Sequence, residues 1–147
     1  MSGEPNRALM AAGALSALAA FLHLGCIVFG APWYRALGAG EWMARASIAG
    51  HWYPVVATLA IASVLTVWSL YAFSAAGALR RLPLLRTALG LVTAVYLLRG
   101  LAAVPMMSVF PGRSVSFWLW SSGICLGIGV VHLIGLLQVW KRLGRSV

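Results

Sequence analysis

The stretch YPVVATLAIASVLTVWSLYAFSAAGAL, residues 53–79, carries no charged side chain along its whole length. A helix needs roughly 20 mostly apolar residues to cross about 30 Å of hydrocarbon, so this stretch is long enough to span a bilayer. Backbone groups in lipid must be paired within the segment, and the stretch lacks the alternation of polar and apolar residues that is typical of a barrel strand. It therefore predicts a transmembrane helix.

One similar apolar stretch precedes this one in the sequence and two follow it. Hydrophobic residues make up 62% of the 147 residues and charged residues only 9%, which is far from the balance of a soluble protein. Most connections between the stretches are short, so sequential helices should be antiparallel neighbours. We expect an all-α, integral membrane protein folded as an up-down-up-down four-helix bundle in a single domain, 1–147. The predicted helices cover about 8–30, 53–79, 85–108 and 115–141.

The connection over residues 31–52 is the only extended one. It contains several tryptophans, which concentrate at the boundary between membrane and water. The segment EWMARASI, which begins at Glu41, predicts a short helix lying in this boundary. Glu41 and Arg45 are then an i,i+4 ion pair, and Trp42 and Met43 dip into lipid.

The positions of the basic residues predict the orientation. Seven lie in the terminal tails and in the connection between the second and third helices, against three in the other two connections. Cytoplasmic loops carry the excess of Lys and Arg, so both termini should be cytoplasmic. We expect a multi-pass protein of a bacterial inner membrane, with the first and third connections in the periplasm. The seven are Arg7, Arg80, Arg81, Arg86, Lys141, Arg142 and Arg145, and the three are Arg35, Arg45 and Arg113.

The net charge of +9 also raises the question of nucleic acid binding. The charges flank the predicted spans and form neither a basic helix nor an aromatic-interleaved basic stripe that could follow a phosphate backbone. Clusters of Lys and Arg beside a span bind anionic lipid headgroups instead. We expect membrane lipids as partners and no nucleic acid.

Arg99 is the one Lys or Arg inside the four apolar stretches, which run over residues 8–30, 53–79, 87–107 and 115–140. An ionisable side chain in a membrane helix is rare and is by default a functional-site hypothesis. In one interpretation its long side chain reaches the periplasmic interface, or pairs with Glu41 and ties the loop onto the bundle. In the other it anchors a lipid phosphate, a carboxylate or a quinone oxygen, because its planar fork binds such groups bidentately.

Five side chains make up the candidate ligand site in the periplasmic half. Tyr96 lies one turn before Arg99 on the same helix face, and the helical rise places the others near the same depth. His132 lies apart by the same estimate, which disfavours a bis-His haem with His23. The five candidates are Arg99, His23, Tyr96, His51 and Glu41.

The sequence gives little sign of a metal site. Zinc wants three or four close ligands, and only His23, His51 and Glu41 approach such a set. Cys26 and Cys125 form no Cys-x-x-Cys pair, which disfavours a disulfide exchanger and favours buried free thiols. We expect no metal and no cofactor.

Catalysis has as little support. Neither acidic residue lies in a predicted span, which disfavours a proton- or sodium-coupled antiporter. No Ser-His-Asp arrangement, phosphate loop or dinucleotide fingerprint is present, so we expect no catalytic residue. The expected function is that of a non-enzymatic accessory or structural membrane protein. The alternative is a binder or carrier of an amphipathic anionic small molecule, lipid or quinone.

Gly123 and Gly127 form a Gly-x-x-x-Gly spacing in the fourth predicted helix. Small residues at this spacing let two helix backbones approach closely. The spacing predicts helix packing, either inside the bundle or between two copies in a homodimer. A partner membrane subunit is a further alternative for an accessory protein.

Five short segments are distinctive: His23-Leu-Gly-Cys, Trp33-Tyr34-Arg35, Gly38-Ala-Gly-Glu41, Arg81-Leu-Pro-Leu-Leu-Arg86 and Tyr96-Leu-Leu-Arg99-Gly. On these segments the chain resembles the small four-helix inner-membrane proteins that are common in Gram-negative bacteria. The resemblance covers most of the length. It implies a fold and a location, and it brings no activity and no catalytic residue.

Overall fold

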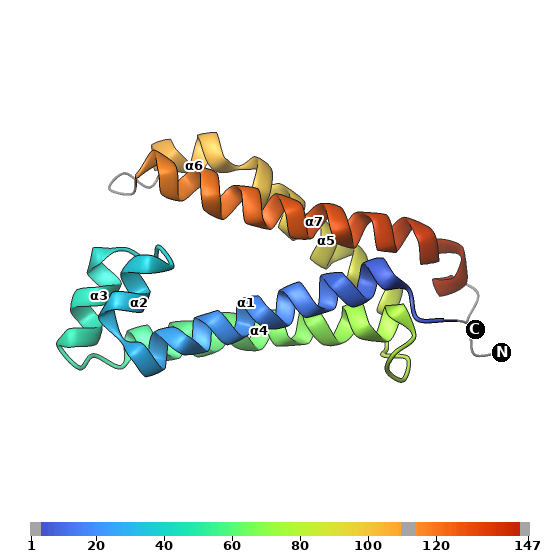
Figure 1. Cartoon of the computed structure of the whole chain (residues 1–147), viewed down its shortest axis with the longest axis horizontal. Coiled ribbons are helices and arrows are strands. Elements are labelled where there is room, and N and C mark those ends of the chain that lie inside the picture. The colour runs from blue at the N-terminus through green and yellow to red at the C-terminus, as the bar shows by residue number, and fades with distance from the viewer. Residues whose placement is uncertain (1–3, 110–113, 145–147) are drawn as a thin grey trace. The chain divides into compact units, whose positions relative to one another are not determined.

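The computed structural model describes residues 4–109 and 114–144, and all regular structure in these ranges is helical (Figure 1). The all-α fold class is therefore confirmed. The elements in chain order are α1 (Arg7–Phe29), α2 (Ala31–Ala36), α3 (Glu41–Ile48), α4 (Tyr53–Ala76), α5 (Leu85–Leu101), α6 (Ala103–Val109) and α7 (Val115–Leu143).

Three of the described helices, α1, α4 and α7, are each long and apolar enough to cross a membrane. α5 and α6 together make a fourth candidate, but the two are bent by 67° at the break between them. The described chain suits a multi-pass membrane protein with three spans, or with four if α5 and α6 form one broken span. Arg113 and Arg145, which contributed to the predicted orientation, lie outside the described residues.

The helix predicted over 85–108 is not continuous, because α5 ends at Leu101 and α6 starts at Ala103. Pro105 has no N–H to donate to the Leu101 carbonyl four residues earlier, so an unbroken helix would lose that hydrogen bond. In the first turn of α6, the proline nitrogen falls among the groups that a helix leaves unpaired anyway. The chain accommodates the proline by ending one helix and starting another.

The structure also differs from the prediction in one helix end and in one additional helix. The helix predicted over 53–79 ends at Ala76, where the next residue, Gly77, adopts a φ of +91°. A left-handed glycine of this kind commonly terminates a helix. The 31–52 connection contains two helices, of which only α3 was predicted.

Contacts divide the chain into two compact units, which are described separately. Unit 1 consists of Met1–Ser16 and Trp68–Val147, and unit 2 consists of Ala17–Val67. α1 and α4 contribute to both, because each begins in one unit and ends in the other. The single domain predicted for the whole chain stays a prediction.

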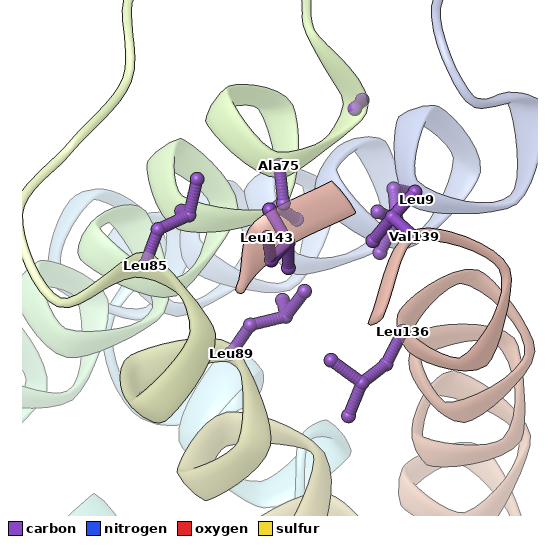
Figure 2. Packing of buried hydrophobic residues seen from close by; sticks show 9 residues of the cluster. Leu9, Ala75, Leu85, Leu89, Leu136, Val139 and Leu143 are labelled. Carbon is purple, nitrogen blue, oxygen red and sulfur yellow. The ribbon is translucent and has the colours of Figure 1, made fainter. Parts of the chain in front are cut away.

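The core of unit 1 brings together one end of each long helix. Side chains from the start of α1, the end of α4, the start of α5 and the end of α7 point toward one another (Figure 2). The four ends therefore share one apolar cluster. Its buried members are Leu9, Ala72, Ala75, Ala76, Leu85, Leu89, Leu136, Val139 and Leu143.

Two arginines brace the same helix ends. Arg142 on α7 donates to the Ala75 carbonyl in the last turn of α4 at 2.8 Å. Arg81, which follows α4, donates to the Leu143 carbonyl at the end of α7 at 2.6 Å. Cations suit helix C-termini, where the last carbonyls lack partners within the helix and carry partial negative charge. These two basic residues therefore have a structural role besides their bearing on orientation.

α5 and α7 approach closely where each presents a glycine. A Cβ atom on Gly100 would lie 2.7 Å from backbone atoms of Leu126, and one on Gly129 would lie 3.0 Å from the backbone nitrogen of Leu97. Neither position has room for a larger side chain. The two contacts fix the register between the helices, and this register positions the candidate site.

In unit 2, α2 and α3 pack against each other and against the first turns of α4. Tyr34 is 2% exposed, and its hydroxyl lies 3.1 Å from the Thr58 hydroxyl. Met43 is half-buried and packs against the buried cluster around Tyr34, and its contact with lipid stays a prediction. Consecutive helix residues point about 100° apart, so Trp42 is exposed while Met43 is partly covered.

Candidate anion site around Arg99

Arg99 lies in the last turn of α5 and reaches across to α7. Its Nη1 donates to the Ser122 hydroxyl at 3.0 Å, and its Nη2 donates to the Ser121 hydroxyl at 2.8 Å. Arg99 is half-buried and Ser122 is buried. The two terminal nitrogens are thus each held by a neutral partner on the same helix.

An aromatic ring completes this arrangement. The guanidinium carbon of Arg99 lies 5.3 Å from the centre of the Trp118 ring, within the range of a cation–π interaction. Trp118 is 1% exposed and lies one turn before Ser121 and Ser122. The Ser114 hydroxyl caps α7 by accepting from the Phe117 N–H at 3.1 Å, which stabilises the turn that carries Trp118.

Carboxylates take part in other interactions. In the described part of unit 1, Arg99 contacts hydroxyl groups and a ring but no acidic side chain. Glu4 pairs with Arg7 at 3.6 Å. A cation among neutral partners favours anion binding, because no resident anion has to be displaced.

The break after α5 changes the setting of Arg99. In the helix predicted over 85–108 the residue lay well inside the span, about 13 Å from its end. In the structure it lies two residues before Leu101, the last residue of α5, which is about 3 Å of helical rise. The charge therefore lies in the last turn of α5 rather than well inside a longer helix.

Tyr96 contacts a different set of residues. Its hydroxyl lies 3.0 Å from the hydroxyl of Ser16, and its ring packs edge-on against Trp68 with centres 5.0 Å apart. The His132 ring lies 5.2 Å from the Tyr96 ring, so the prediction that His132 lies apart from Tyr96 is wrong. The close approach at Gly100 sets the register between α5 and α7, and this register brings Tyr96 beside His132. Depths estimated from the helical rise along unbroken helices did not predict this contact.

His132 is completely buried. Its Nδ1 lies 3.0 Å from the Ile128 carbonyl, which can only accept, so Nδ1 carries the hydrogen. Its Nε2 has no hydrogen-bond partner among the described residues. This histidine is held by its own helix and by the Tyr96 ring.

The other three predicted site residues belong to unit 2. His23 donates from Nδ1 to the Ala19 carbonyl of its own helix at 2.7 Å, given that this carbonyl accepts. Glu41 accepts two hydrogen bonds from Arg35, at 2.8 and 3.0 Å, and one from Arg45 at 3.3 Å. His51 is exposed and lines a pocket at the start of α4. The convergence of all five residues stays a prediction.

Two further expectations concern ligand chemistry. Within residues 4–109 and 114–144, no group of three or more His, Cys, Asp or Glu side chains is arranged to hold a metal ion. Cys26 and Cys125 are free thiols, the first buried and the second half-buried.

The predicted glycine pair differs from the glycines that pack. A Cβ atom on Gly123 or Gly127 would meet no described atom within 4 Å. Among the described glycines of unit 1, Gly100, Gly129 and Gly135 instead lie close to the backbone of a neighbouring helix, the last beside Leu9. A packing role for Gly123 and Gly127 stays a prediction.

Sequence reasoning missed the residues that hold Arg99. Ser121, Ser122 and Trp118 are separated from Arg99 by about 20 residues, and nothing local links them. The sequence offers one signal: two adjacent serines, Ser121 and Ser122, interrupt the apolar fourth helix, and the third helix, expected to run antiparallel to it, carries Arg99. Polar side chains inside a membrane helix are expected to face such a charge.

Comparison with known proteins adds no relative: no family model, curated protein or solved structure matches the chain.

Proposed function

We propose that the protein is a non-enzymatic accessory or structural protein of a bacterial inner membrane, and that Arg99 gives it a binding site for an amphipathic anion. The observation that carries the proposal is the pairing of the Arg99 guanidinium with two neutral hydroxyl groups. An arginine inside a membrane commonly pairs with an acidic side chain or with backbone carbonyls, whereas the described contacts of Arg99 are two hydroxyl groups and an aromatic ring.

The chemistry of the three polar side chains supports anion binding. A serine hydroxyl that accepts from Arg99 still has its own hydrogen to donate. Arg99, Ser121 and Ser122 can therefore offer guanidinium and hydroxyl hydrogens to the same oxygen atoms. Suitable ligands are a lipid phosphate or a carboxylate with an apolar tail, or the oxygen of a quinone.

The proposed topology is the up-down-up-down bundle with both termini in the cytoplasm. It is supported by the apolar cluster of unit 1, which joins the start of α1 and α5 to the end of α4 and α7. Alternating starts and ends are what an antiparallel bundle requires. Basic residues also concentrate beside this cluster, as expected for a cytoplasmic face.

Native mass spectrometry of the full-length protein, purified in a mild detergent, tests the binding site. We expect a lipid or quinone adduct on the wild type that is lost in Arg99→Gln. Arg80→Gln removes the same charge at an exposed position and should retain the adduct. A partner protein in the wild-type spectrum without any small-molecule adduct would favour a purely accessory role.

Size-exclusion chromatography separates loss of binding from loss of folding. Arg99→Lys keeps the charge but lacks the planar fork, so we expect it to elute as folded protein with a weakened adduct. An adduct that persists in folded Arg99→Gln contradicts the proposed site.

A further inference from the structure

Unit 2 contains a second feature with the properties of a ligand site. A pocket of about 520 Å³ lies at the junction of α3 and α4. Its volume is within the range of roughly 300–1,000 Å³ that is common for small-molecule sites. The lining residues are Trp42, Arg45, Ala46, Ala49, His51, Trp52 and Tyr53.

The pocket lies where lipid headgroups are expected. Tyr53 is the first residue of α4, one of the candidate membrane spans, so the pocket adjoins the end of a span. Trp42 is 66% exposed and Trp52 is 72% exposed. Both rings contact the ring of Tyr53 in the first turn of α4. Exposed tryptophan and tyrosine rings beside a span are typical of the interfacial layer.

The pocket also contains a cation with donors to spare. Glu41 is held mainly by Arg35, whose Nε and Nη2 both donate to it. Arg45 contributes to the same carboxylate through Nε alone, at 3.3 Å. In the described part of unit 2, the two terminal nitrogens of Arg45 make no hydrogen bond that would occupy them. The Arg45 side chain is 78% exposed and can turn toward a bound group.

The arrangement of these groups selects a class of ligand. Arg45 offers two parallel N–H donors, a geometry that matches two oxygens of a phosphate. His51 adds a ring nitrogen to the lining, and the indole and phenol rings offer apolar surface to the first carbons of a glycerol or acyl chain. A soluble phosphate would use the donors but not the rings.

We propose that this pocket binds the phosphodiester headgroup of an anionic phospholipid from the leaflet at the N-terminal end of α4. Arg45 holds the phosphate, and Trp42 and Trp52 contact the lipid beside it. The site is independent of Arg99, so either proposal can fail without the other. It also differs from the lipid contacts expected of the basic residues at the opposite helix ends.

Energy transfer from tryptophan to dansyl-labelled phosphatidylglycerol tests the proposal, with the full-length protein in a non-ionic detergent. A charge-assisted hydrogen-bonded pair typically contributes enough for at least about tenfold in affinity. We therefore expect Arg45→Gln to weaken binding at least about tenfold and Arg45→Lys to weaken it less. Arg80→Gln, which removes the same charge at an exposed position elsewhere, should leave this binding within about twofold of the wild type.

Three competitors identify the source of the phosphate. Unlabelled phosphatidylglycerol should displace the probe, whereas glycerol phosphate and the zwitterionic phosphatidylcholine should displace it at least about tenfold less well. Displacement by glycerol phosphate at concentrations similar to those of the lipid would overturn the lipid assignment. Wild-type affinity in folded Arg45→Gln, or a loss confined to Arg99→Gln, would overturn the site itself.

Discussion

Arg99 and Tyr96 lie one turn apart on α5, yet they take part in different interactions of unit 1. Arg99 reaches Ser121 and Ser122, while Tyr96 contacts Ser16 and His132. Residues at i and i+3 share a face of a helix, but a long side chain can reach one or two turns farther than its neighbour. Sharing a face therefore did not make them share a site.

The hydrogen bond between Tyr96 and Ser16 should stabilise unit 1. Ser16 is completely buried, so removing its partner leaves a polar group in an apolar surrounding. We expect Tyr96→Phe and Ser16→Ala each to lower the free energy of unfolding by about 1 kcal/mol, with a coupling of similar size in the double variant. Unfolding of the full-length protein by sodium dodecyl sulfate in mixed micelles measures these changes.

Tyr71→Phe provides the matched control. The Tyr71 hydroxyl donates to the Pro83 carbonyl at 3.3 Å in an exposed setting, where water can replace it. Its loss should change the free energy of unfolding less than the loss of the Tyr96 hydroxyl does. Strictly additive effects of Tyr96→Phe and Ser16→Ala would show that the two hydroxyls do not interact.

Glu41 should titrate far below the usual range of a glutamate. Hydrogen bonds from Arg35, and to a lesser extent Arg45, lower its pKa from 4.5 to about 2. Because the folded pKa lies below the unfolded one, the ion pairs stabilise the α2–α3 pair above about pH 4.5 and lose this effect as the pH falls toward 2. Carbon-13 NMR of the Glu41 carboxyl group should give a midpoint near 2.

Arg35→Gln tests the cause of this shift. The main hydrogen-bond donor to Glu41 is then removed, and the midpoint should move up toward 4.5 while remaining below it because Arg45 is still present. A midpoint near 4.5 in the wild type would mean that the α2–α3 ion pairs do not form in solution.

At the scale of elements, the register of α5 on α7 depends on two glycines. Gly100→Ala would bring a Cβ atom to 2.7 Å from the Leu126 backbone, which cannot move aside as a flexible side chain can. We expect the helices to separate and the free energy of unfolding to fall by about 1–3 kcal/mol. The same denaturation experiment measures the loss.

Gly123→Ala is the control within α7, because a Cβ atom there would meet no described atom within 4 Å. It replaces glycine by a better helix former in an open position, so we expect it to be neutral or slightly stabilising. A loss equal to that of Gly100→Ala would show that Gly123 packs against something, such as a second copy of the chain.

For the whole molecule, the number of spans decides where the C-terminus lies. If α5 and α6 together cross the membrane as one broken span, the chain crosses four times and its two ends lie on the same side. We expect a C-terminal green fluorescent protein fusion to be fluorescent in bacteria and a C-terminal alkaline phosphatase fusion to be inactive. A phosphatase fused within residues 37–40 should be active, because this connection is expected in the periplasm.

The opposite result at the C-terminus has a definite structural meaning. An active C-terminal phosphatase together with a cytoplasmic N-terminus would require an odd number of crossings. α5 and α6 would then enter and leave on one side as a re-entrant pair, which is the other geometry compatible with a 67° bend.

Much of the helical structure could be predicted from local sequence. The start of α7 at Val115, α3 over residues 41–48 and the Glu41–Arg45 pair follow the predictions. The errors occur where one residue changes the backbone: Pro105 divides a helix, and Gly77 ends one early. Both residue types were visible, but their effect depends on hydrogen bonds that neighbouring turns gain or lose.

Local sequence is enough to establish a helical chain with several apolar stretches long enough for a membrane, because length, polarity and charge are local properties. The contacts of Arg99 with Ser121 and Ser122, and of Tyr96 with His132, follow from the tertiary structure. Those contacts depend on the register between α5 and α7. That register is set where two glycines allow the backbones to touch, and neither helix alone shows which of its small residues meets which partner.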